Sequence, residues 1–232
     1  MEIKTNRKRL LAQQTELRRV MTSSGWFDEA MPLFFDQHAS LHTAQIRAEK
    51  SGDRLTEFWS FEDAILDDLS EAQFRLIPEN CEHSIVWCIW HLARIEDVAM
   101  NILVADSSQV FTQAGWQERL GVPFRDCGNE MDDGEMLELS AMIDLQALRD
   151  YRAAVGSQTQ KIAAQLKETD LKNRVDPIRI QHVLDEGAIL EGARGITDYW
   201  SRRDIAGLLL MPASRHNLIH LGEAQQLKQR KH

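Results

Sequence analysis

Apolar residues recur at spacings of three and four along four segments, and this is the period of one face of a helix. The clearest stripe starts behind Ser84, a residue suited to capping a helix, and consists of Ile85, Cys88, Leu92, Ile95, Ala99 and Ile102. Three further stripes cover 27–45, with the helix ending near 51–52, then 145–166 and about 203–227. Pro212 falls inside the last stripe, where it either kinks the helix or begins its second part.

Two long connections separate these helices. Segments 106–143 and 168–200 hold most of the glycines, and we expect short helices there at most. No segment shows strict alternation of apolar and polar residues, so little β-structure is expected. Four long helices with two long connections predict an all-α protein with a four-helix bundle.

The first 22 residues form a separate feature. They predict a basic amphipathic helix with Ile3, Leu10, Leu17 and Val20 on its apolar side. We expect this helix to pack on the outside of the bundle or on a partner. The expected organisation is therefore an N-terminal helix at 1–22 and a bundle domain at 23–232.

Composition places the chain among ordinary globular proteins. Its 232 residues are 43% hydrophobic and 27% charged. The longest apolar run, Ile85–Trp90, is far shorter than the roughly 20 residues needed to span a bilayer, so no membrane association is expected. The sequence opens on no secretory leader, and its three cysteines are odd in number, which together predict a cytoplasmic protein.

The net charge of −9 is unevenly distributed. Basic residues gather near both ends, whereas residues 20–227 hold 34 acidic against 18 basic residues. Such a body repels a phosphate backbone, so a nucleic-acid role would have to rest on the short basic termini. The expected partner is a small-molecule substrate.

The eight histidines are the most informative residues. Five share helix faces with apolar residues and are expected to point into the bundle: His38, His42, His91, His216 and His220. On a wheel of about 100° per residue, His216, His220 and Glu223 fall within about 40° of one another. A histidine pair at this spacing offers two nitrogens to one metal ion, and a facing helix supplies the third. Imidazole ligands suit zinc, iron, nickel or copper, and three ligands leave a position open for water or substrate.

Simpler interpretations remain open at this stage. The histidines can instead be buried hydrogen-bonding groups with no metal, and His83, His182 and His232 are expected to be solvated because they lie off the stripes. Arg94, Glu96 and Asp97 are expected to form an exposed charge cluster, and Cys88 a buried inert thiol. Glu223 is a candidate acid–base group, fourth ligand or carboxylate that orients a histidine.

Two segments resemble the DinB/YfiT-like superfamily. After Pro78, residues 82–97 read EHSIVWCIWHLARIED and contain the His-Leu-Ala step of that family. Residues 215–223 read RHNLIHLGE, similar to its HxxxHxGQ motif, with Glu223 where many members have Gln. The resemblance covers about 24–228 and leaves the basic N-terminal helix outside.

This resemblance implies an antiparallel four-helix bundle, a homodimer, and a metal held by His91, His216 and His220. Characterised relatives include bacillithiol or mycothiol S-transferases, a thiol-dependent isomerase and the bundle domain of ergothioneine synthases. We therefore expect zinc, nickel or iron and transfer of a low-molecular-weight thiol to an electrophile. Glu223 or His42 would accept the proton, and His42 is also a candidate fourth ligand. The alternative is a non-catalytic bundle that binds or senses metal and acts through dimerisation.

Overall fold

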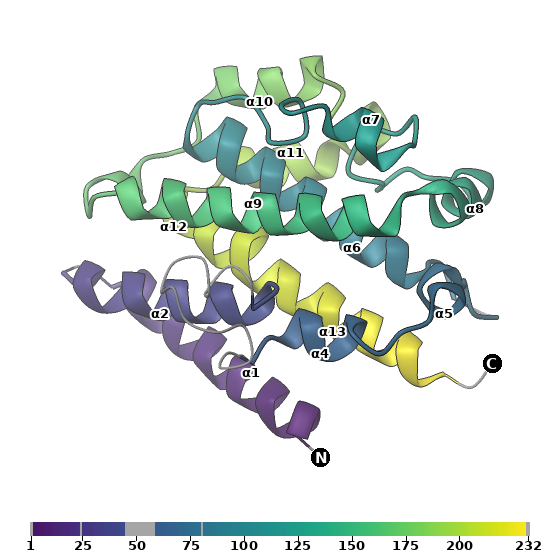
Figure 1. Cartoon of the computed structure of the whole chain (residues 1–232). Coiled ribbons are helices and arrows are strands. Elements are labelled where there is room, and N and C mark those ends of the chain that lie inside the picture. Colours follow the sequence, from purple (N-terminus) through teal and green to yellow (C-terminus); the bar gives the residue numbers. More distant parts are fainter. Residues whose placement is uncertain (1, 24, 45–58, 80, 231–232) are drawn as a thin grey trace.

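The computed structural model describes residues 2–23, 25–44, 59–79 and 81–230. Within these residues the chain is built of helices, and β-structure is limited to one isolated bridge between Arg174 and Asp204. The all-α bundle is thus confirmed (Figure 1). Two predictions lie outside the described residues: the continuation of the first bundle helix into 45–52 and the solvent exposure of His232.

Four long helical segments form the bundle. They are α2 (Phe27–Leu41), α6 (Ile85–Asp97) with its π-helical extension Val98–Val104, α9 (Leu145–Gln165), and α12 (Ile205–Leu210), which continues through the π-helical turn Met211–Arg215 into α13 (His216–Gln229). The Ser84 hydroxyl accepts a hydrogen bond from the Trp87 amide and so caps α6 as expected. Pro212 lies in the π-helical turn, so the fourth helix continues past it.

Shorter helices fill the connections. They are α4 (Phe61–Leu66), α5 (Glu71–Arg75), α7 (Trp116–Leu120), α8 (Asp133–Met142), α10 (Pro177–Asp185) and α11 (Arg194–Ser201). The basic segment forms α1 (Glu2–Met21), whose Leu10, Leu17 and Val20 are buried. This helix lies beside α2 at the outer side of the bundle (Figure 1).

The helix directions explain the first of the two long connections. Helix α13 runs opposite to α6, while α9 runs beside α6 in the same direction (Figure 1). Hydrogen bonds agree with this direction, since Ser84 at the start of α6 meets Ser140 of α8, just before α9, at 2.7 Å, and Asp97 at the end of α6 meets Tyr151 of α9 at 2.6 Å. A parallel neighbour cannot be reached by a tight turn, so the chain needs the 106–143 connection to return to the starting end.

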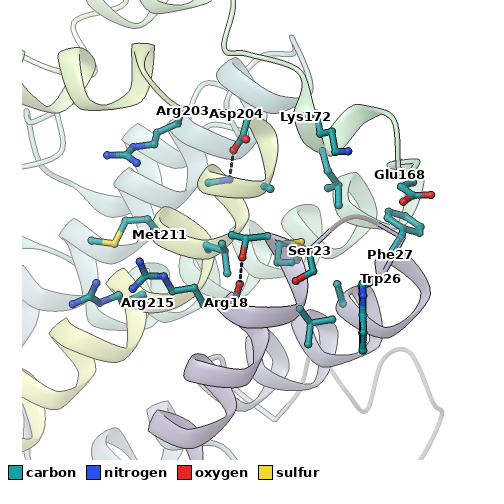
Figure 2. Close-up of a pocket in the computed structure, with 18 of the residues that line it drawn as sticks. Arg18, Ser23, Trp26, Phe27, Glu168, Lys172, Arg203, Asp204, Met211 and Arg215 are labelled. Carbon is teal, nitrogen blue, oxygen red and sulfur yellow. Dashed lines mark hydrogen bonds between the residues drawn. The ribbon is translucent and has the colours of Figure 1, made fainter.

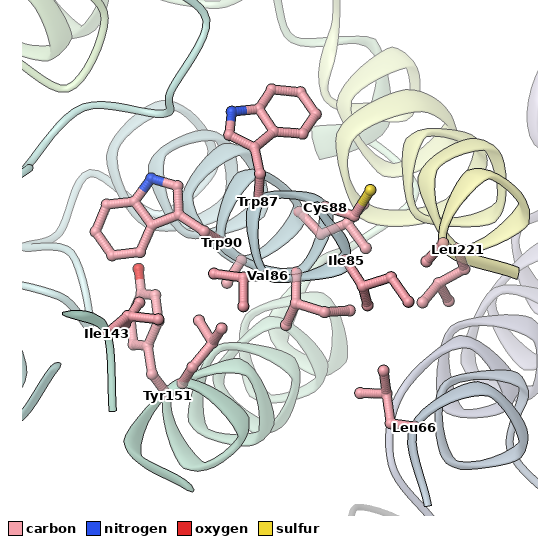
Figure 3. Close-up of a cluster of buried hydrophobic side chains, with 14 of the residues drawn as sticks. Leu66, Ile85, Val86, Trp87, Cys88, Trp90, Ile143, Tyr151 and Leu221 are labelled. Carbon is pink, nitrogen blue, oxygen red and sulfur yellow. The ribbon is translucent and has the colours of Figure 1, made fainter. Parts of the chain in front are cut away.

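Helix α6 lies at the centre and is buried along its whole length. Figure 3 shows Trp87, Cys88 and Trp90 of α6 with Tyr151 of α9 and Leu221 of α13 in the surrounding apolar cluster. No described helix is both long enough and apolar enough to cross a membrane.

The expectation of an exposed Arg94–Glu96–Asp97 cluster is wrong, because all three side chains are buried. Asp97 accepts hydrogen bonds from the Tyr151 hydroxyl at 2.6 Å and from the amides of Val110 and Phe111 at 2.8 Å. Arg94 donates to the Tyr151 oxygen and to the backbone oxygen of Arg125. These charges are therefore interior anchors for α9 and for the 106–143 connection.

Glu96 joins all four bundle helices. Its carboxylate accepts from His38 at 2.8 Å and His42 at 3.1 Å on α2, from Arg152 at 2.8 Å on α9, and from Asn217 at 2.7 Å on α13. Burial opposes ionisation of Glu96, but the surrounding donors outweigh it and hold its pKa well below the usual range. Arg152 also contacts the buried Glu62 at 3.2 Å.

Replacing Arg152 is expected to destabilise the bundle strongly. Arg152→Met leaves Glu96 and Glu62 buried without their cation, which we expect to lower the free energy of unfolding by about 3 kcal/mol or more. Arg149→Met, one turn earlier on α9, removes partly exposed contacts with Asp63 and Asp67 and should cost less than about 1 kcal/mol. Urea denaturation followed by circular dichroism measures both, and similar costs would contradict the role given to Arg152.

Candidate metal centre

Three histidines from two helices meet at one point of the bundle. His91 on α6 and His216 and His220 on α13 each place a ring nitrogen within 4.8 Å of the other two. The Nε2 atoms of His91 and His216 are 3.1 Å apart. Two nitrogens bound to a tetrahedral metal at about 2.0–2.1 Å would be separated by about 3.3 Å, so the observed spacing fits a shared ion.

A loop carbonyl orients His91. Its Nδ1 donates to the backbone oxygen of Cys127 at 2.7 Å. Trp87, one turn earlier on α6, donates to the oxygen of Gly128 at 3.0 Å, and Arg94 donates to that of Arg125. Residues 87, 91 and 94 thus hold the 125–128 loop from one face of α6. The 106–143 connection therefore forms part of the site.

A carboxylate orients His220. Glu223 accepts from His220 Nδ1 at 2.8 Å and makes a second short contact with His83 Nε2. Burial raises the pKa of Glu223, but hydrogen bonds from His220 and His83 outweigh it and lower that pKa to about 2. An ionised carboxylate accepts only, so Glu223 keeps the proton of His220 on Nδ1.

His83 is a site residue that the periodicity missed. We expected it to be solvated, but it is mostly buried, contacts Glu223 and lies on the Trp87 ring with centroids 4.1 Å apart. It precedes α6, so no stripe could include it. Its position just before the Ser84 cap, one turn from Trp87, was the available signal.

The donor set fits a transition metal. His91 Nδ1 is bound to a carbonyl and His220 Nδ1 to a carboxylate, and both partners only accept hydrogen bonds, so both Nε2 atoms present lone pairs. Burial, followed by the proximity of His220, lowers the pKa of His91 to about 3. Burial, followed by the proximity of His91 and His220, holds the pKa of His216 well below its usual range. The neutral imidazoles suit zinc, iron or nickel.

A cavity of about 360 Å³ opens beside the three histidines. Its remaining walls come largely from the two long connections and are mostly apolar or aromatic: Trp87, Ile95, Asn129, Gly195, Ile196, Tyr199, Trp200, Met211 and Pro212. Such a cavity leaves room for a small ligand at an open coordination position.

His38 and His42 do not join this centre. They lie with Glu96 in a second, fully buried group, and their rings are stacked with centroids 4.2 Å apart. That group has carboxylate and imidazole donors, but Arg152 lies 2.8 Å from the same Glu96 oxygen that His42 contacts. A guanidinium at this position repels a metal cation, so this group fits a metal poorly.

The family comparison covers the segments that carry these histidines. The model of the DinB superfamily matches residues 54–224, about three quarters of the chain, including all three. The chain belongs to the DinB superfamily. The match begins after α1 and α2, so the two N-terminal helices lie outside the matched DinB region. A search of curated proteins finds no match.

Two buried cysteines of this DinB-superfamily chain are not activated. Cys81, Cys88 and Cys127 are free thiols. Burial, reinforced by the charge of Glu223, raises the pKa of Cys88 well above its usual range, and burial raises that of Cys127 to about 12. Cys88 therefore fits the expected inert thiol.

Gly128 is expected to be indispensable for the loop that orients His91. Its φ is +77°, and an added Cβ would lie 2.9 Å from Trp87 Nε1. Gly187 is a matched control, with φ of +66° and nothing within 4 Å of a Cβ. Gly187→Ala should cost about 1 kcal/mol from backbone strain, and Gly128→Ala at least about 1 kcal/mol more. Equal unfolding free energies for the two variants would show that the Trp87 contact is unimportant.

Proposed function

We propose that His91, His216 and His220 bind a divalent transition metal, zinc, nickel or iron, and that the protein is a metal-dependent enzyme. The proposed reaction transfers a low-molecular-weight thiol to an electrophilic small molecule. One observation carries the proposal: acceptor-only partners keep the protons of His91 and His220 on Nδ1 and leave Nε2 unprotonated, and these rings converge with His216 beside a cavity. The thiol chemistry rests on the family resemblance.

The metal, when bound, would act as a Lewis acid that lowers the pKa of a thiol or water near it. The chain's own groups prepare that position. The backbone oxygen of Cys127 orients the ring of His91, and the carboxylate of Glu223 orients that of His220. The Trp87 ring stacks on His91 with centroids 4.5 Å apart. The apolar side chains of Ile196 and Trp200 line the cavity and exclude water from the reacting groups.

Glu223 is best suited to positioning. Its lowered pKa and its contacts with two histidines favour the orienting role over that of proton acceptor, because an effective base has a pKa near the working pH. The proton-acceptor roles of Glu223 and His42 stay predictions. A homodimer and a cytoplasmic location also stay predictions.

Metal content is the first test. Protein purified without a histidine tag should contain near-stoichiometric zinc, nickel or iron by elemental mass spectrometry, and His91→Ala should lose it because two ligands on one helix bind weakly. His182→Ala, which alters an exposed histidine on α10, is the matched control and should retain the metal. The metal-loaded protein should consume bacillithiol, mycothiol, glutathione or coenzyme A with a generic electrophile, whereas His91→Ala should not.

The outcomes separate the hypotheses. Metal that binds through the histidines without turnover of any of the four thiols would favour the non-catalytic metal-binding or sensing bundle. A wild-type protein that binds no added metal would leave the histidines as hydrogen-bonding groups and would overturn the proposal.

Glu223 variants test the orientation of His220. Glu223→Gln keeps a carbonyl oxygen that can accept from His220 Nδ1, so metal affinity should change little. Glu223→Leu removes the acceptor and should weaken metal binding about 10- to 100-fold. Competition with a chromogenic chelator measures both affinities. A Gln variant as weak as the Leu variant would show that the negative charge, and not the hydrogen-bond acceptor, is what the site needs.

A further inference from the structure

A second cavity, larger than the one beside the histidines, lies away from the histidine rings. It has a volume of about 780 Å³ and is enclosed by α1, the start of α2, the 168–174 segment and α12 (Figure 2). Six basic residues line it: Arg18, Lys172, Arg174, Arg202, Arg203 and Arg215. Its acidic lining residues are Glu168 and Asp204. In a chain with net charge −9, this concentration of cations is an exception that favours an anionic occupant.

Both acidic side chains are already engaged. Asp204 caps α12 by accepting from the Gly207 amide at 2.8 Å, and Glu168 accepts from the Gly25 amide at 3.0 Å. Arg18, Arg203 and Arg215 take part in none of the ion pairs among the described residues. Figure 2 shows the side chains of all three on the same side of the close-up, with Met211 between Arg203 and Arg215 in this view.

Arg203 carries an unsatisfied donor. Its Nε is buried and has no hydrogen-bond partner among the described residues, while its guanidinium carbon lies 4.0 Å from the centre of the Tyr199 ring. Because Nε is shut off from solvent, an anion in the cavity would bind the outer nitrogens of the Arg203 guanidinium and not Nε. Arginine suits this task because its planar fork matches the oxygens of a carboxylate or phosphate.

This cavity adjoins the histidine cavity. Tyr199 and Met211 line both, and Arg215 directly precedes the candidate ligand His216. We propose that the basic cavity binds the oxyanionic end, carboxylate or phosphate, of the small molecule that reacts at the histidine centre. This inference rests on the proposed function. Binding energy from such a remote group would position the reacting end.

Anion binding by the metal-free full-length protein tests the cavity itself. Inorganic pyrophosphate and citrate, titrated separately by calorimetry, represent phosphate and carboxylate groups. We expect binding of at least one anion, weakened about tenfold or more in Arg18→Gln and in Arg215→Gln, and weakened by added salt. Arg19→Gln is the matched control, because Arg19 neighbours Arg18 on α1 but pairs with Glu16 and does not line the cavity. The preferred anion identifies the chemical group.

A turnover assay tests the link to the histidine centre. The anion that binds should inhibit wild-type turnover competitively against the thiol or the electrophile, and about tenfold less effectively in Arg18→Gln. Absence of binding by both anions, or equal binding by all the variants, would overturn the inference even if the histidines hold a metal. If the protein binds no metal even when metal is added, arginine-dependent anion binding would instead overturn the proposed function and leave the cavity as an anion site. Non-competitive behaviour would separate the cavity from the reaction.

Discussion

The carboxylate of Glu96 is the interaction on which the bundle depends. A buried carboxylate is stable only when it is paired and hydrogen-bonded, and each of its partners here comes from another helix. His38 and His42 bring α2, Arg152 brings α9 and Asn217 brings α13. Any shift of one helix along another would strip Glu96 of a donor, so the network sets the relative position of all four.

The relative position of the helices also sets the geometry of the candidate metal centre. Asn217 donates to Glu96 and directly follows His216, so the bond that holds α13 against α6 also holds His216 against His91. The π-helical turn at 211–215 contributes as well, because its wider turn rotates the following residues relative to α12. The positions of the histidines are therefore consequences of the helix packing and not of the HxxxH spacing alone.

The connections and α1 surround the bundle of this DinB-superfamily chain. Carbonyls of the 125–128 loop accept hydrogen bonds from Trp87, His91 and Arg94, and residues of α11 line the small cavity. Helix α1, outside the matched DinB region, lines the basic cavity with Arg18. The bundle helices thus supply the three histidines, and the surrounding segments supply much of the walls of both cavities.

Local features of the structure could be determined from the sequence. Helical periodicity, the Ser84 cap and the grouping of His91, His216 and His220 follow from spacing along single helices and from a family motif, because a helix repeats every 3.6 residues whatever surrounds it. The burial of Arg94, Glu96 and Asp97, the separation of His38 and His42 from the candidate metal centre, and the recruitment of His83 were decided by the tertiary structure. Charged side chains are expected to be exposed unless a partner is known, and the partners of Glu96 are distant in sequence: His42 lies 54 and Asn217 121 residues away along the chain. Periodicity indicates which face of a helix a residue occupies, whereas only the packing of the helices determines which groups contact that face.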